Sequence, residues 1–164
     1  MRQITVYTFN ELKPEIQKKV HERAGWRENP WQYENYRAWD KFIKLFKVIV
    51  IDYDSRYGFV RFGYPDDDTW HGLSGRKLVL RIWRKLRDWD AGFSMEFHII
   101  ETAKKFLRKS AMKKGYGIED FLNYTFREFI DQDKKEEEDY NTFESFKEDM
   151  EINGYEFTES GVQI

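Results

Sequence analysis

Lysine and arginine side chains gather in one stretch of this 164-residue chain, and their spacing points to phosphate binding. Twelve of the 28 lysines and arginines fall within residues 76–114. Cations on exposed helix faces neutralise several phosphates of a nucleic acid, with an affinity that falls steeply as salt rises. No motif of a known DNA- or RNA-reading module accompanies them, so contacts to backbone or shape are expected. The candidate cations are Arg76, Lys77, Arg81, Arg84, Lys85, Arg87, Lys104, Lys105, Arg108, Lys109, Lys113 and Lys114.

The alternative for these cations is a solvated basic face that pairs loosely with the protein's own acidic side chains. Residues 1–115 form a basic body, with 24 Lys and Arg against 15 Asp and Glu. Residues 116–164 form an acidic C-terminal third, with 4 against 15. A chain with a formal net charge of −2 therefore carries two opposite poles, and their separate fields can steer binding.

Carboxylates in the acidic third are spaced along one expected helix, where they imitate the phosphate row of a nucleic acid. A protein that binds nucleic acid is the partner such a row would attract. The alternative is a solvated face that keeps the protein in solution, and Lys134 and Lys135 interrupt the row. The carboxylates are Glu119, Asp120, Glu128, Asp131, Asp133, Glu136, Glu137, Glu138 and Asp139.

Aromatic residues are dense near the middle of the basic body, where they make up 12 of the 39 residues from 26 to 64. Tyrosine and tryptophan combine apolar area with a polar tip, so exposed rings anchor interfaces or stack on unpaired bases. Core packing is the alternative for most of them, but a chain of this size cannot bury every ring, and the exposed remainder indicates binding. The partner-binding residues predicted from the rings and the acidic row are Trp31, Tyr33, Tyr36, Tyr53, Tyr57, Tyr64, Glu128, Asp131, Glu136, Glu137 and Glu138.

Catalytic and metal-binding patterns are weak. Asp52 and Asp54 begin like a calcium loop, but Arg56 occupies a ligand position, Gly58 comes one position late and no glutamate closes the loop. The histidines are scattered and suggest no triad. The absence of cysteine excludes a thiol nucleophile, a disulfide and thiolate metal sites. We therefore predict that the protein is not an enzyme and uses no cofactor. The alternative is a metal-dependent, nuclease-like enzyme that uses Asp52, Asp54, Asp66, Asp68 and His71.

An α+β fold has to position these side chains. Residues 3–8 alternate as a strand does, and Pro14 begins a helix that should run to about Arg23. A second helix is expected after Asn29, and residues 47–53 and 57–64 read as a β-hairpin. The prediction is a single domain, residues 1–164, with a small and mostly antiparallel sheet packed by four to six helices.

The second half of the chain is expected to be mostly helical. Leu78, Ile82 and Leu86 mark one helix face. Residues 92–100 fit either a strand in the sheet or the start of a helix that continues to about Met112. Two amphipathic helices and a short closing strand at residues 155–158 are predicted for the acidic third.

Both ends of the chain resemble a widespread group of small phage and prophage proteins. The segment from Thr5 to Val20 contains Phe-Asn-Glu-Leu-Lys-Pro-Glu, similar to the group's Phe-x-Glu-Leu-Ser-Pro-Glu after a strand. The segment from Asn153 to Gly161 is similar to the group's ending, Asn-x-Tyr-Glu-Phe-Thr-x-x-Gly. Lys13 stands in place of the usual serine, which removes a helix-capping hydroxyl and affects stability only.

The resemblance implies a phage accessory protein, of a kind often involved in host takeover or in blocking host immunity, including restriction and CRISPR systems. The expected function is stoichiometric binding that inhibits or redirects a host protein or ribonucleoprotein. The expected place of action is the host cytoplasm, as a monomer or small homo-oligomer without membrane contact, because no apolar run approaches the roughly 20 residues of a membrane span. Direct nucleic-acid binding through residues 76–114 is the first alternative.

Overall fold

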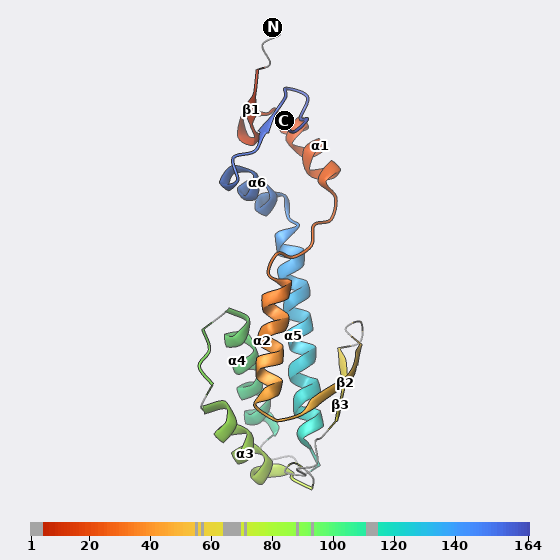
Figure 1. Cartoon of the computed structure of the whole chain (residues 1–164), viewed down its shortest axis with the longest axis vertical. Helices are drawn as coiled ribbons and strands as arrows, with labels where there is room; N and C mark the ends of the chain where they lie inside the picture. The colour runs from red at the N-terminus through yellow and green to blue at the C-terminus, as the bar shows by residue number, and fades with distance from the viewer. Residues whose placement is uncertain are drawn as a thin grey trace. The chain divides into compact units, whose positions relative to one another are not determined.

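The computed structural model describes residues 5–54, 56, 58–63, 70, 72–87, 89–92, 94–110 and 115–164. These residues form six α-helices and two small antiparallel sheets of two strands each, so the predicted α+β class is confirmed (Figure 1). The elements in chain order are β1 (Tyr7–Thr8), the 3₁₀ helix η1 (Phe9–Glu11), α1 (Pro14–Ala24), α2 (Gln32–Lys44), β2 (Ile49–Asp54), β3 (Phe59–Gly63), α3 (Gly75–Arg87), α4 (Ser94–Ser110), α5 (Ile118–Tyr140), α6 (Phe143–Ile152) and β4 (Glu156–Phe157).

The chain divides into two compact units. The terminal unit is made of residues 1–29 and 135–164, and the central unit of residues 30–134. Helix α5 contributes to both, and neither boundary coincides with the change of charge at residues 115 and 116. Each unit has its own cluster of buried hydrophobic side chains. In the part of the chain that the structure describes, no helix combines the length and apolar character that a membrane span requires.

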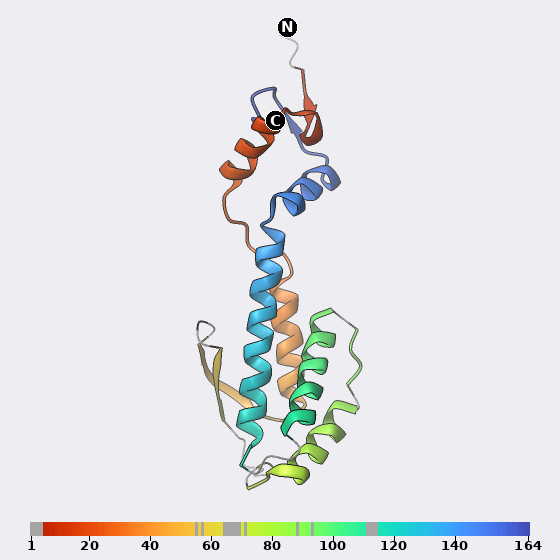
Figure 2. The same cartoon turned by 180° about the vertical axis from the view of Figure 1, so that it is seen from behind.

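Aromatic rings form much of the core of the central unit. Helix α2 lies between α4 and α5 in both cartoon views (Figure 1, Figure 2). Trp39 and Phe42 of α2 follow the three-to-four-residue spacing of one helix face and are at most 3% exposed. Trp39 packs against the ring of Phe126, with centroids 5.0 Å apart, and Phe42 packs against Phe121 at 6.0 Å. The dense aromatic segment therefore supplies core as well as surface.

The predicted hairpin is present and lies along α5. Strands β2 and β3 pair antiparallel, with an irregularity in register between Val50 and Asp52. The backbone N–H of Val60 donates to Asn123 Oδ1 over 2.8 Å, which ties β3 to α5. Val60 and Phe62 are buried at 1% and 5% exposure, so one face of the hairpin packs against the helices.

Residues 94–110 form a helix, and the strand alternative for this segment is wrong. Met95, Ile99 and Ala103 of α4 recur at helical spacing and are at most 1% exposed, whereas a strand would have buried alternate residues. Glu96 supports the helix start by accepting a 2.7 Å hydrogen bond from the Gly92 backbone N–H. The expected shared sheet is consequently replaced by two separate ones, β1 with β4 and β2 with β3.

Both chain ends build the terminal unit. Strand β1 pairs with β4, which confirms the predicted closing strand. Phe9 is 1% exposed, and its ring lies 5.5 Å from that of Phe146. Gly161 has a φ of +78°, and a Cβ at this position would come within 2.7 Å of Ile16 and 2.8 Å of Val20 in α1. Glycine is therefore the residue that fits this close approach.

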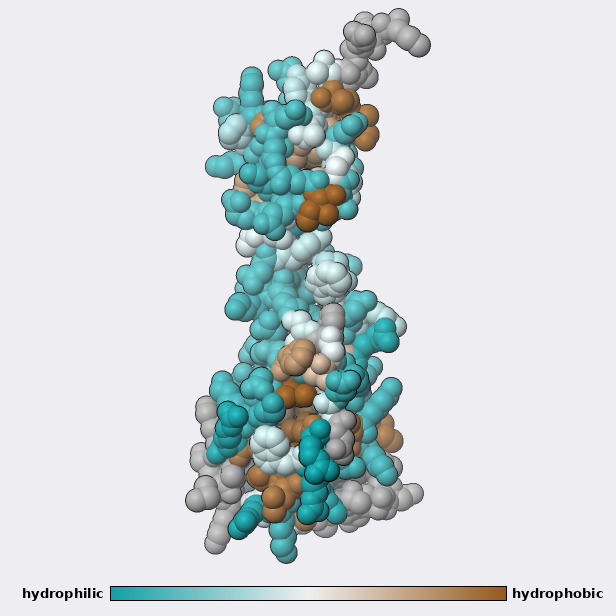
Figure 3. Space-filling model, turned by 90° about the vertical axis from the view of Figure 1, so that its left-hand side faces the viewer, coloured by the Kyte–Doolittle hydropathy of each residue, from teal (hydrophilic) through white to brown (hydrophobic). Residues whose placement is uncertain are grey.

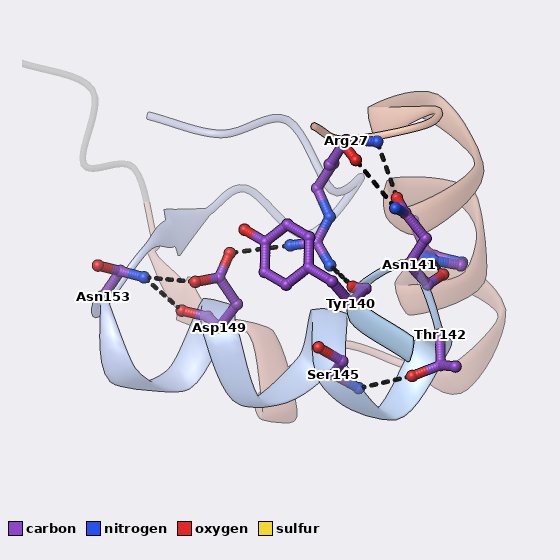
Figure 4. A network of polar contacts seen from close by, with 8 residues as sticks. Arg27, Tyr140, Asn141, Thr142, Ser145, Asp149 and Asn153 are labelled. Atoms are coloured by element: carbon purple, nitrogen blue, oxygen red, sulfur yellow. Dashed lines mark hydrogen bonds and ion pairs between the residues drawn. The ribbon is translucent and has the colours of Figure 1, made fainter. Parts of the chain in front are cut away.

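Arg27 organises a polar network within the terminal unit (Figure 4). Its Nη1 donates to Asp149 Oδ2 over 2.9 Å, and its Nη2 donates to the backbone carbonyl of Tyr140. The guanidinium also lies 4.1 Å from the centre of the Tyr140 ring. Asn141 closes the network, since its side chain accepts from the Arg27 N–H at 2.8 Å and donates to the Arg27 carbonyl at 2.9 Å. These bonds join the segment after α1 to the turn between α5 and α6. Thr142 caps α6 by accepting from the Ser145 N–H at 3.3 Å.

Candidate binding surfaces

Several predicted partner-binding rings are exposed. In the central unit, Trp31 and Tyr33 at the start of α2 are 57% and 71% exposed, and Tyr53 of β2 is 57% exposed. Tyr36 is half-buried, with its ring edge-on to Phe129 at 5.3 Å. Tyr57 and Tyr64 lie outside the described residues.

The structure brings Tyr36 and Tyr53 together. Burial raises the pKa of the Tyr36 phenol above its ordinary value of 10.0, and the Asp133 carboxylate and the Tyr53 phenol raise it further because both disfavour a nearby negative charge. Tyr53 also packs its ring edge-on to Phe126 of α5 at 6.4 Å. The start of α2 and the inner side of the hairpin thus share a tyrosine-rich border.

Tyr36 is expected to make the protein less stable at high pH. Its neutral form is favoured in the folded state, so above pH 10.0 the unfolded chain releases the phenol proton first. This stabilisation is complete below pH 10.0 and is lost as pH rises through the higher folded pKa. Urea midpoints measured from about pH 9 to 11 should fall less steeply for Tyr36→Phe than for wild type. Tyr33→Phe, which removes an exposed phenol, is the matched control, and an equal change in both variants would contradict the assignment.

The outer face of the hairpin exposes aliphatic and aromatic side chains that the sequence analysis did not single out. Ile49, Ile51 and Phe59 are 58%, 57% and 54% exposed. Ile51 lies over Gly63, because a Cβ built on that glycine would come within 3.1 Å of Ile51 Cδ1. For β3 the available signal was strand parity, since Phe59 alternates with the buried Val60 and Phe62. In β2 the irregularity in register between Val50 and Asp52 breaks the alternation, so parity alone would have placed Tyr53 on the same face as Ile49 and Ile51.

The predicted acidic row on α5 does not form one continuous face. Asp133 is 8% exposed and accepts a 2.8 Å hydrogen bond from Asn35 Nδ2, so it belongs to the interior of the central unit. Asp131 is exposed and Glu128 is half-buried. At about 100° per residue, Asp131 lies roughly 140° around α5 from the Phe126 that contacts Tyr53. These carboxylates and the tyrosine-rich border therefore face different directions.

The remaining acidic candidates, Glu136, Glu137 and Glu138, belong to the terminal unit. Glu137 Oε1 accepts a 2.9 Å hydrogen bond from the indole N–H of Trp26, and Glu138 is exposed. Trp26 remains 65% exposed despite this bond. A tryptophan and a carboxylate therefore lie side by side on the surface of this unit.

Helix α3 carries a high density of positive charge. It holds six cations and no acidic residue. Arg76, Lys77 and Arg84 are exposed, and none of them has a hydrogen bond or ion pair within the described residues. Arg81 lies over the ring of Trp70, 5.7 Å from its centre. Lys85 is half-buried on the same helix. Three of the six cations of α3 therefore have no pairing partner among the described residues, while Arg81 and Arg87 do make interactions, so internal pairing stays an open alternative.

Helix α4 continues the basic surface with some internal neutralisation. Lys104 donates to Glu101 over 2.8 Å, and this bond, together with the charges of Lys104 and Arg108, lowers the pKa of the Glu101 carboxyl. Lys105 and Arg108 are exposed. The side chain of Lys109 lies outside the described residues, as do Lys113 and Lys114.

A groove of about 420 Å³ runs between α3 and α4 beside these cations. Figure 3 views this side of the central unit and shows hydrophobic surface, in brown, among hydrophilic side chains, in teal. Trp89 lines the groove at 8% exposure, and its indole N–H is buried without a hydrogen-bond partner among the described residues. The cations could be predicted from the sequence, but the groove could not, because its lining comes from separate segments. The lining residues are Leu80, Trp83, Arg84, Leu86, Arg87, Trp89, Ile100 and Lys104.

The described part of the chain contains no cluster of metal-ligating side chains that would support the metal-binding alternative. Within those residues, no group of three or more His, Asp or Glu side chains is arranged to hold a metal ion. Asp52 and Asp54 are exposed on β2, and Asp54 accepts a 2.9 Å bond from the Arg56 N–H. The other members of this alternative, Asp66, Asp68 and His71, lie outside the described residues, so it stays a prediction.

No protein-family model, curated protein or solved structure matches the chain. The resemblance of its ends to phage proteins therefore stays a prediction. The function has to be argued from the surfaces described above.

Proposed function

We propose that this protein is a phage-type accessory protein that binds a host protein or ribonucleoprotein stoichiometrically and inhibits or redirects it. The resemblance of the two chain ends supports this context, and it makes a host-immunity complex of the restriction or CRISPR type the target class. The proposed action is steric or competitive, so no reaction is assigned to the protein. It acts in the host cytoplasm as a monomer or small homo-oligomer.

The observation that carries the proposal is the exposed apolar surface of the hairpin and the start of α2. Ile49, Ile51, Tyr53 and Phe59 of the hairpin are each more than half exposed, and so is Tyr33 of α2. Single exposed hydrophobic residues are ordinary, but a gathering of them on one element indicates an interaction site. Tyrosine and phenylalanine are also among the residues enriched in protein interfaces.

The hairpin geometry gives such a partner a second means of attachment. Strand β2 pairs with β3, and no third strand joins their sheet within the described residues. The edge of β3 is held by Asn123 of α5 through Val60. An edge strand offers backbone N–H and C=O groups to an extended segment of another protein, and its alternate side chains confer specificity.

Affinity capture tests this function. The full-length protein, immobilised and exposed to a host lysate at several salt concentrations, is expected to retain a host protein in a constant molar ratio. The double variant Ile49→Ser, Ile51→Ser removes exposed aliphatic side chains of β2 and is expected to weaken retention at least 10-fold, because truncation of hot-spot residues at the centre of an interface weakens binding by about 2 kcal/mol or more, on the order of 30-fold.

A matched control distinguishes binding at the hairpin surface from nonspecific hydrophobic binding. Phe97→Ser on α4 and Ile152→Ser on α6, combined in one chain, alter exposed apolar residues outside both the hairpin and the α3–α4 groove, at 57% and 84% exposure. They are expected to leave retention of the host protein unchanged. Retention of no host protein at any salt concentration, or equal loss in both double variants, would count against the proposal.

A further inference from the structure

The groove between α3 and α4 combines features that the hairpin surface lacks. Its floor contains Leu80, Leu86 and Ile100 together with the rings of Trp83 and Trp89. Its volume of about 420 Å³ lies within the roughly 300–1,000 Å³ typical of small-molecule sites. A flat apolar group of a ligand can therefore lie against this open groove.

Positive charge borders this apolar floor. Arg84, Arg87 and Lys104 line the groove, while Arg76 and Lys77 lie further along α3. Two of these lining cations already have interactions, since Lys104 pairs with Glu101 and Arg87 also has an internal contact. Arg84 is exposed and has no ion pair within the described residues. The ligand that complements this border carries negative charge beside its apolar part.

The groove residue Trp89 also has a hydrogen-bond donor without a partner in the described part of the chain. A buried donor without a partner costs about 1–3 kcal/mol, so a native structure normally satisfies it. The indole N–H of Trp89 is buried and lacks a partner among the described residues, and the same side chain lines the groove. Trp89 therefore lines the groove with apolar ring surface, and its N–H is not accessible to a ligand in this conformation.

We propose that the α3–α4 groove binds single-stranded nucleic acid, with one unstacked base over Trp83 and the flanking phosphates on the α3 cations. A base supplies the flat apolar group, and the phosphates supply the negative charge. Single strands are recognised by this combination of aromatic stacking and a cationic border. A duplex keeps its bases stacked on one another, so they are not free to stack on Trp83, and a peptide of glutamate alone has no planar ring to place there. This inference is independent of the hairpin surface in the proposed function.

Fluorescence anisotropy with the full-length protein tests the inference. The probes are labelled oligo-dT and oligo-U, a duplex of matched length and an oligo-glutamate peptide, each titrated over a series of salt concentrations. Both single-stranded probes are expected to bind more tightly than the duplex and the peptide, with affinity falling as salt rises. A preference between oligo-dT and oligo-U distinguishes DNA from RNA as the source of the strand.

Variants of the groove identify the site. Trp83→Ala is expected to weaken single-strand binding roughly 5- to 100-fold through lost stacking, and Trp83→Phe to retain most of it. Arg84→Gln should lower the salt slope by about 0.7, the value for one phosphate contact in a single strand. Arg37→Gln removes the same charge from an exposed position on α2 of the same unit and is the matched control.

The possible results either support or contradict a single-strand site in the groove. Tighter single-strand binding that Trp83→Ala lowers and Trp83→Phe preserves supports the site. Equal binding of duplex and single strand, an equal effect of Arg84→Gln and Arg37→Gln, tighter binding of the peptide, or no binding at low salt would each overturn it. Circular dichroism of every variant checks the fold, and partly exposed Trp83 makes unfolding an unexpected result.

Discussion

Replacement of Phe121 by alanine is expected to lower the free energy of unfolding of the central unit by about 3–5 kcal/mol. Phe121 is 0% exposed on α5, and its ring lies 6.0 Å from that of Phe42, 5.6 Å from Phe46 and 5.5 Å from Phe106. These partners come from α2, the segment after it, and α4. The smaller side chain would leave a cavity where three elements meet, since packed interiors close such gaps only partly.

Hydrogen exchange of the α2 and α4 amides measures this loss within the central unit. Phe97→Ala is the matched control, because Phe97 lies on α4 with 57% of its surface exposed. The control is expected to change stability by no more than about 0.5 kcal/mol. If the two substitutions lowered amide protection equally, the aromatic core described here would be wrong.

The substitution Arg27→Met is expected to destabilise the terminal unit by about 2–4 kcal/mol. The side chain of Arg27 is 16% exposed, and its loss would leave the Asp149 carboxylate and the Tyr140 carbonyl without this donor. Methionine keeps much of the apolar stem, so the effect reports the guanidinium. Hydrogen bonds of this kind contribute more than neutral ones because at least one partner is ionised.

Hydrogen exchange of the α1 and α6 amides checks the Arg27 prediction. Arg23→Met is the control, since Arg23 is exposed and makes one long contact, 3.4 Å from its Nη1 to the Gly161 carbonyl. The control should cost about 0.5 kcal/mol or less. Similar losses for Arg27→Met and Arg23→Met would show that the network in Figure 4 does not hold the unit together.

Local patterns allowed much of the fold to be predicted. Pro14 marked the start of α1, where the first helical position tolerates a missing N–H. The spacing of Leu78, Ile82 and Leu86 identified the buried face of α3, and all three are at most 4% exposed. These predictions succeeded because the signals act within a few residues of one another.

Features that depend on distant contacts could not be predicted. Residues 92–100 fit two periodicities, and the choice of helix depended on packing against α2 and on the Glu96 bonds to Gly92 and Lys41. Nothing local indicated that the first and last strands would form a sheet separate from the hairpin. Such pairings are decided by the burial of whole elements, which periodicity alone does not reveal.

The candidate surfaces, too, could be predicted only where the signal lies within one segment of the chain. Composition located the cations of α3 and the dense rings, because each is a property of a single segment. The groove depends on Trp89 and Ile100, which come from different elements and meet only in the folded unit. The burial of Asp133 was equally hidden, since its partner Asn35 is 98 residues away in the sequence.

The composition of the two units sets an order of events during synthesis. The central unit is one continuous stretch, so all of its contacts are available before the ribosome has delivered residues 135–164. The terminal unit is made of two segments that are distant in the sequence. Strand β1 can pair with β4, and α1 can pack against Gly161, only after residues 135–164 have been synthesised. A nascent chain halted after residue 134 would therefore present a folded middle with an unsatisfied leading segment, which is the stage at which chaperones and proteases would meet it.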